Sequence, residues 1–167
     1  MTVDELANRE LKLYNAVSKL TGTIEDKVIQ IKRLGISDGY QRIHKEYAKL
    51  NKTNLEALKR GLFLIWYSRS EPSFLTGIVE LDSESEIKII KTLDRRLRQN
   101  VTDYELDWMI DYYSTWDFLF QTFSEYKFFQ DRLKRTVKTE RPETFDNDSM
   151  SGRGQMGIYW NSLNKSA

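Results

Sequence analysis

The sequence predicts an all-α fold, an irregular or up-down bundle of five to six helices with a polar C-terminal tail. Apolar residues recur at helical spacing through most of the first 136 residues, and Ser/Thr-x-x-Glu capping boxes open several of these stretches. The run from Gly61 to Tyr67 has no polar side. Because a helix that is apolar all round must be covered on every side, we expect the helix over residues 53–70 to lie at the centre of the bundle.

Three helices are expected before this central one. Thr2 and Glu5 form a capping box at the start of the first, and Gly22 ends it. A shorter helix covers residues 23–34, and a third ends near residue 50. The side chains of the second helix that are expected to face the core are Ile24, Val28 and Ile31.

The central helix is expected to end near Glu71-Pro72, because proline disfavours helical backbone in the residue before it. Residues 73–81 are apolar but short, and are interpreted as a buried crossover loop. Two longer helices follow, over residues 83–100 and 102–136. The second would be about 50 Å long, so a kink or break is expected between residues 114 and 124. The core residues expected from the first are Ile87, Ile90, Leu93 and Leu97.

The helical pattern fails after Val137. Residues 1–137 are therefore expected to form one helical domain, and residues 138–167 a flexible polar tail. Ile158, Tyr159, Trp160 and Leu163 interrupt the polarity of that tail, so residues 158–163 are expected to form a docking segment.

The composition suits one globular domain. The chain has 167 residues, of which 40% are hydrophobic and 31% charged. A net charge of +1 provides no whole-molecule field to attract nucleic acid or an anionic membrane. The lack of cysteine excludes disulfides and thiolate chemistry. No signal-peptide pattern or membrane-spanning run is present, so a cytoplasmic location without a membrane partner is predicted. No cofactor is predicted.

Three aspartates suggest a possible metal site. Asp103, Asp107 and Asp111 fall four residues apart, which places their carboxylates along one side of a helix. Such a pattern suits Mg²⁺ carrying a phosphorylated substrate. The preferred interpretation is a salt ladder with the preceding antiparallel helix, because the metal hypothesis leaves that helix's basic stripe unused. The basic residues expected to face the aspartates are Lys91, Arg95 and Arg98.

The aromatic residues are the strongest functional hint. Rings recur every four residues from Tyr104 to Phe120, and a stripe with this step drifts round the helix, so the rings cannot all face one partner. Arg69 and Glu71 lie where the buried central helix meets a loop, and together could bind an anionic ligand. The candidate ligand-binding or partner-binding residues are Trp66, Arg69, Glu71, Trp108, Tyr112, Trp116, Tyr159 and Trp160.

The leading hypothesis is a non-catalytic helical module that binds itself or another protein through these aromatic residues. No catalytic residue is assigned. The alternative is a Mg²⁺-dependent enzyme acting on a phosphorylated small molecule through the aspartate stripe. A weaker alternative is nucleic-acid binding through the basic cluster between Lys127 and Arg141. The sequence disfavours nucleic acid as a partner, since basic residues are expected at a helix C-terminus from the dipole alone.

Overall fold

The computed structural model describes residues 1–142 and 147–164, and these residues contain helices and no strand. The predicted all-α bundle is confirmed. The α-helices are α1 (Val3–Ser18), α2 (Ile24–Arg33), α3 (Ile36–Leu50), α4 (Leu55–Ser70), α5 (Ser73–Thr76), α6 (Ser83–Arg98), α7 (Tyr104–Tyr113), α8 (Lys127–Leu133), α9 (Asn147–Met150) and α10 (Gly154–Asn164). A 3₁₀ segment, η1 (Ser114–Phe123), joins α7 to α8.

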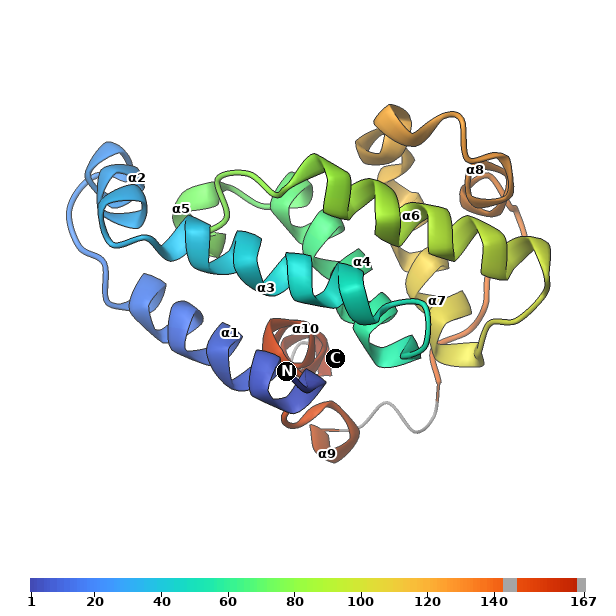
Figure 1. The fold of residues 1–167 in the computed structure, drawn as a ribbon, viewed down its shortest axis with the longest axis horizontal. Helices are drawn as coiled ribbons and strands as arrows, with labels where there is room; N and C mark the ends of the chain where they lie inside the picture. Colours follow the sequence, from blue (N-terminus) through green and yellow to red (C-terminus); the bar gives the residue numbers. More distant parts are fainter. Residues whose placement is uncertain (143–146, 165–167) are drawn as a thin grey trace.

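The central helix α4 packs against α3, α6, α10 and η1 (Figure 1). Every residue from Gly61 to Trp66 is buried, which confirms the predicted covering of this tract, while Tyr67 is half-buried. Gly61 lets α4 approach α6 closely. A Cβ atom at this position would lie 2.5 Å from Cδ1 of Ile89, so a larger residue would force the two helices apart.

The break expected between residues 114 and 124 is confirmed. Trp116, inside η1, has the non-helical angles φ −122° and ψ 48°, so the helical path is interrupted there. The segment expected to be a single long helix is therefore divided into α7, η1 and α8. Residues 73–76, expected to belong to a loop, form the short helix α5.

Three helices are capped one residue away from the expected Ser/Thr-x-x-Glu boxes, which begin at Thr53, Ser83 and Thr102. The box of Thr2 and Glu5 is present. The caps of α4, α6 and α7, however, are Asn54, Asp82 and Asp103, each accepting the N–H three residues further on at 2.8 to 3.1 Å. Asparagine and aspartate are at least as good as serine or threonine at this position, and in all three cases one of them stands beside the predicted cap.

Two predicted core residues are exposed. Ile24 of α2 is 55% exposed and Ile87 of α6 is 44% exposed. The inward face of α6 is instead set by Ile89 and Ile90, and by Glu86, which turns inward to meet Arg69 on α4. A sequence pattern with several isoleucines in a row allows more than one rotation of the helix, and the contact with α4 selects one of them.

The last described helix, α10, packs against α1 and α4, and the N-terminus lies near this contact (Figure 1). Met156 and Trp160 are fully buried there. Residues 158–163, expected to form a docking segment, lie in α10. Residues 143–146 and 165–167 of the predicted tail lie outside the described residues. The predicted domain boundary at residue 137 and the flexibility of the tail stay predictions.

Candidate functional site

Most of the candidate aromatic residues meet in one cluster between α4, α7, η1 and α10. Trp66 lies at its centre, with ring centroids 5.0 Å from Tyr113 and 6.5 Å from Trp160, both stacked. Trp108 meets Trp160 edge-on at 4.8 Å. Because Trp66, Trp108 and Trp160 are at most 8% exposed, they belong to the core and offer no surface to a partner.

The margin of this cluster reaches the surface. Tyr112, Trp116 and Tyr159 are half-buried. The hydroxyls of Tyr112 and Tyr159 lie 2.7 Å apart in a hydrogen bond, and burial raises the pKa of Tyr159. Phe118, two residues after Trp116 in η1, is 58% exposed. We call Tyr112, Trp116, Phe118 and Tyr159 the aromatic margin.

Arg69 and Glu71, proposed as a pair, are not paired. The Arg69 guanidinium instead donates to both carboxylate oxygens of Glu86 at 3.0 Å and lies 4.8 Å from the ring centroid of Phe123. Burial raises the pKa of Glu86 and lowers that of Arg69. Glu86 was missed because the sequence gives no signal for a pair that forms between two different helices.

The expected salt ladder is wrong. Asp103 pairs with Lys59 of α4 at 2.7 Å, and Asp111 pairs with both terminal nitrogens of Arg132 on α8. Asp107 lies 3.9 Å from Arg132. The aspartates therefore receive their cations from α4 and α8, not from α6, because η1 turns the chain back and brings α8 against α7.

These pairs also occupy the carboxylates proposed for Mg²⁺. Burial alone would raise the pKa of Asp111, but hydrogen bonds from Arg132 and the Thr139 N–H hold it below its ordinary value. Within the described residues, no three acidic, histidine or cysteine side chains come together as metal ligands. In the basic cluster proposed for nucleic acid, Arg132 is bound to Asp111 and Lys138 donates to Ser114.

Arg153 holds a second charged network that the sequence did not indicate. Its guanidinium, 13% exposed, donates to Glu56 of α4 at 2.7 Å and to Glu105 of α7 at 2.6 Å. Lys59 also reaches Glu105, at 2.9 Å. The segment before α10 is thereby tied to two other helices.

A buried carboxyl, Glu10 of α1, receives the start of α10. The Gln155 N–H donates to it at 2.7 Å and the Tyr47 hydroxyl also donates to it. Gly154 precedes Gln155 with φ +63°, and a Cβ atom there would lie 2.5 Å from the carboxylate. Burial raises the pKa of Glu10 to about 7, against these hydrogen bonds, which lower it. The sequence signal was available, because Glu10 lies four residues after Leu6 on the apolar stripe of α1.

Because of Glu10, the stability of the fold is expected to depend on pH. The unfolded chain releases this proton near the ordinary pKa of 4.5, whereas the folded chain holds it to about 7. The stabilisation that Glu10 contributes is therefore fully present below the unfolded pKa, and it is lost as the pH rises through the folded pKa of about 7. We expect the free energy of unfolding to fall by about 2 to 3 kcal/mol between about pH 5 and about pH 8 through this group.

Urea denaturation of the wild type and Glu10→Gln at both pH values measures this effect. Glu10→Gln is expected to lose this part of the pH dependence, and Glu25→Gln, an exposed control on α2, to keep it. An identical pH dependence in the wild type and Glu10→Gln would contradict the prediction.

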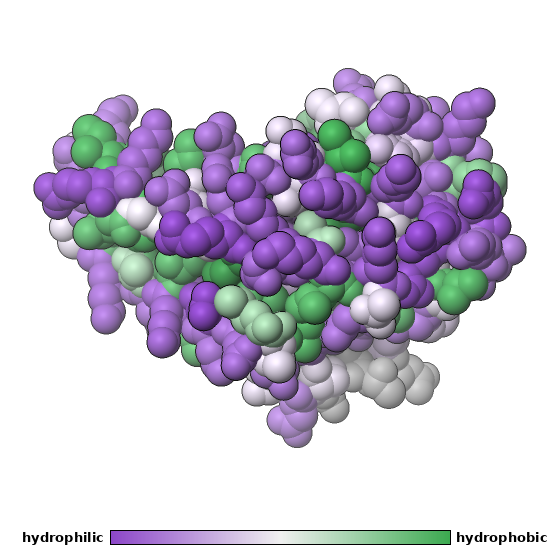
Figure 2. Space-filling model, viewed as in Figure 1, coloured by the Kyte–Doolittle hydropathy of each residue, from purple (hydrophilic) through white to green (hydrophobic). Residues whose placement is uncertain are grey.

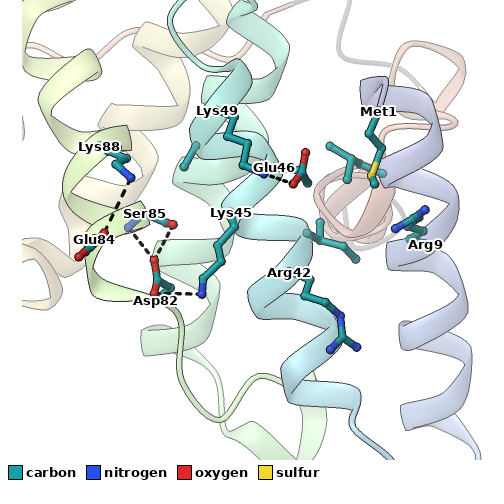
Figure 3. A pocket seen from close by; sticks show the side chains of 13 residues that line it. Met1, Arg9, Arg42, Lys45, Glu46, Lys49, Asp82, Glu84, Ser85 and Lys88 are labelled. Carbon is teal, nitrogen blue, oxygen red and sulfur yellow. Dashed lines mark hydrogen bonds and ion pairs between the residues drawn. The ribbon is translucent and has the colours of Figure 1, made fainter.

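Two grooves lie along the face formed by α3 and α6, where hydrophilic residues predominate (Figure 2). The first, of about 390 Å³, is bounded by α1, α3 and the start of α6 (Figure 3). Lys45 pairs there with Asp82 at 3.3 Å, whereas Arg9 and Arg42 make no ion pair within the described chain. The second, of about 570 Å³, follows α6 toward α8 and shares Lys88 with the first.

No family model, curated protein or solved structure was found to match this chain. Among the described residues, no helix has the length and apolar character needed to cross a membrane.

Proposed function

We propose that the chain is a non-catalytic helical interaction module that associates with a second copy of itself through the aromatic margin. The observation that carries the proposal is an exposed ring beside a hollow. Phe118 projects from η1, and a hollow of about 260 Å³ opens next to it, with Asp117 and Lys134 at its edge. Such a surface is self-complementary, because in a two-fold dimer each Phe118 can enter the hollow of the other copy.

The surroundings of Phe118 support this arrangement. Interfaces combine an apolar centre with a polar rim, and are enriched in aromatic anchors. Trp116 supplies a second, half-buried ring on the same segment, and Gln121, Ser124 and Gln130 supply polar groups around the hollow. The net charge of +1 means that two copies repel each other little.

Light scattering on a size-exclusion column tests the proposal. We expect a concentration-dependent dimer, and a dissociation constant at least about tenfold weaker for Phe118→Asp, because a carboxylate would replace the aromatic anchor and lie beside Asp117. Tyr104→Asp is the matched control, since Tyr104 is 55% exposed at the opposite end of α7. A wild-type monomer at all concentrations, or an equal effect of both variants, would overturn the proposal.

A further inference from the structure

The outer face of α6 carries four exposed cations, Lys88, Lys91, Arg95 and Arg98. They are three, four and three residues apart, which places them on one side of the helix over about 15 Å. Since the aspartates of α7 pair elsewhere, Lys91, Arg95 and Arg98 make no ion pair in the part of the chain that the structure describes. Lys88 approaches only Glu84, at 3.9 Å, and both side chains are exposed.

These cations line the groove of about 570 Å³, whose walls come from the α3–α4 turn and the start of α8. Arg96 donates to the Lys52 carbonyl at 3.3 Å, and so fixes that turn against α6 with Lys52 at the groove. Asp94 accepts the Phe129 N–H at 3.0 Å, which holds the first turn of α8 against α6, and the half-buried Tyr126 just before that turn lines the groove.

The charge of the groove is out of proportion to that of the molecule. The chain has a net charge of +1, yet five cations and one carboxylate line this groove. Like charges three or four residues apart on a helix repel by a few tenths of a kcal/mol per pair. Within the described residues Lys91, Arg95 and Arg98 gain no compensating ion pair, and a concave surface concentrates the resulting potential. An anionic ligand would supply the missing charge.

We propose that the α6 groove binds the phosphate backbone of a single-stranded nucleic acid. Proteins that hold single strands combine a positively charged groove with aromatic rings on which bases stack, and here the cations of α6 and Tyr126 provide both. The neighbouring groove, which shares Lys88, carries carboxylates as well as cations, so the proposed contact is confined to the α6 groove (Figure 3). A line of cations along one helix, in a groove that also holds a tyrosine ring, fits one extended strand better than a duplex or a flat membrane surface.

This inference uses other residues than the proposed dimer surface and does not depend on it. It also differs from the nucleic-acid hypothesis drawn from the sequence. That hypothesis placed the contact on the basic cluster between Lys127 and Arg141, in α8 and the residues after it. The Phe118→Asp variant therefore serves as a further control, and should bind nucleic acid as the wild type does.

Fluorescence anisotropy with labelled oligothymidylate and oligouridylate, each about twelve nucleotides long, tests the cations. With four to five phosphate contacts, the logarithm of the binding constant should fall with the logarithm of salt concentration with a slope of about −3. Lys91→Ala/Arg95→Ala should weaken binding at least about tenfold and make the slope shallower by about 1.4. Lys32→Ala/Arg33→Ala, two exposed cations on α2, should leave binding unchanged.

A second pair of variants tests whether the ring of Tyr126 stacks on a base. Tyr126→Phe retains stacking and should bind as the wild type does, whereas Tyr126→Leu should weaken binding on the order of tenfold. Circular dichroism establishes that each variant is folded. The proposal is overturned if the wild type does not bind at low salt, or if the α2 control loses binding equally. Equal or tighter binding to a duplex, or to phosphatidylserine vesicles through the same cations, would also overturn it.

Discussion

Trp66→Ala is expected to lower the free energy of unfolding by about 3 to 5 kcal/mol. Trp66 is 1% exposed and contacts rings from α7, η1 and α10, so truncation opens a cavity at a point where three elements meet. Its indole N–H has no hydrogen-bond partner in the described residues, so the whole loss comes from packing. For a domain with a stability of about 5 to 15 kcal/mol, this is a large fraction.

Urea denaturation followed by far-UV circular dichroism measures the change, and Phe118→Ala provides the control. Phe118 is a ring of similar character at the surface, so its removal should change stability by less than about 0.5 kcal/mol in the monomer. A loss below about 1 kcal/mol for Trp66→Ala would mean that the aromatic cluster is not the centre of the core.

Arg153→Met is expected to destabilise the chain by about 3 kcal/mol or more. The substitution preserves much of the side-chain length but leaves Glu56 and Glu105 without their shared cation, although Arg60 and Lys59 still contact one of them each. Burial alone would raise the pKa values of both carboxyl groups, but the hydrogen bonds from Arg153 outweigh it and hold them below the ordinary value.

The pH dependence gives this prediction a second test. Because the folded pKa values are lowered, the network stabilises the fold above the ordinary pKa of 4.5, and this contribution is lost as pH falls through the folded values. The difference between wild type and Arg153→Met should therefore shrink in acid. Arg135→Met is the control. Arg135 is exposed, so its substitution should change the free energy of unfolding by less than about 0.5 kcal/mol. A constant difference across the pH range would argue against an ionic origin.

The sequence was sufficient for the fold class and for the position of α4, because both follow from local periodicity. The uniformly apolar tract at residues 61–67 has only one physical solution, which is burial between neighbouring helices. The break near Trp116 was also accessible, since the expected helix was too long for so small a domain.

The arrangement of the site was not accessible in the same way. Glu56 and Arg153 are 97 residues apart, and Glu10 and Gln155 are 145 apart, so no periodic pattern links them. The aromatic residues were singled out as a partner surface, but three of the tryptophans lie in the core because α10 packs against α4 and adds Trp160 to the cluster. The basic stripe of α6 was assigned the aspartates of α7 as partners. Asp111 is instead paired with Arg132, which α8 brings against α7.

The contact between α1 and α10 joins two segments that are far apart in the sequence. During synthesis, the rings of α4 and α7 emerge long before the helix that carries Trp160, and they lack that cover until residues 154–164 have left the ribosome. Contacts between such distant residues require the closure of a long loop before they contribute, which slows folding relative to bundles of sequential hairpins. The nascent chain thus presents to chaperones an apolar surface that the finished protein conceals.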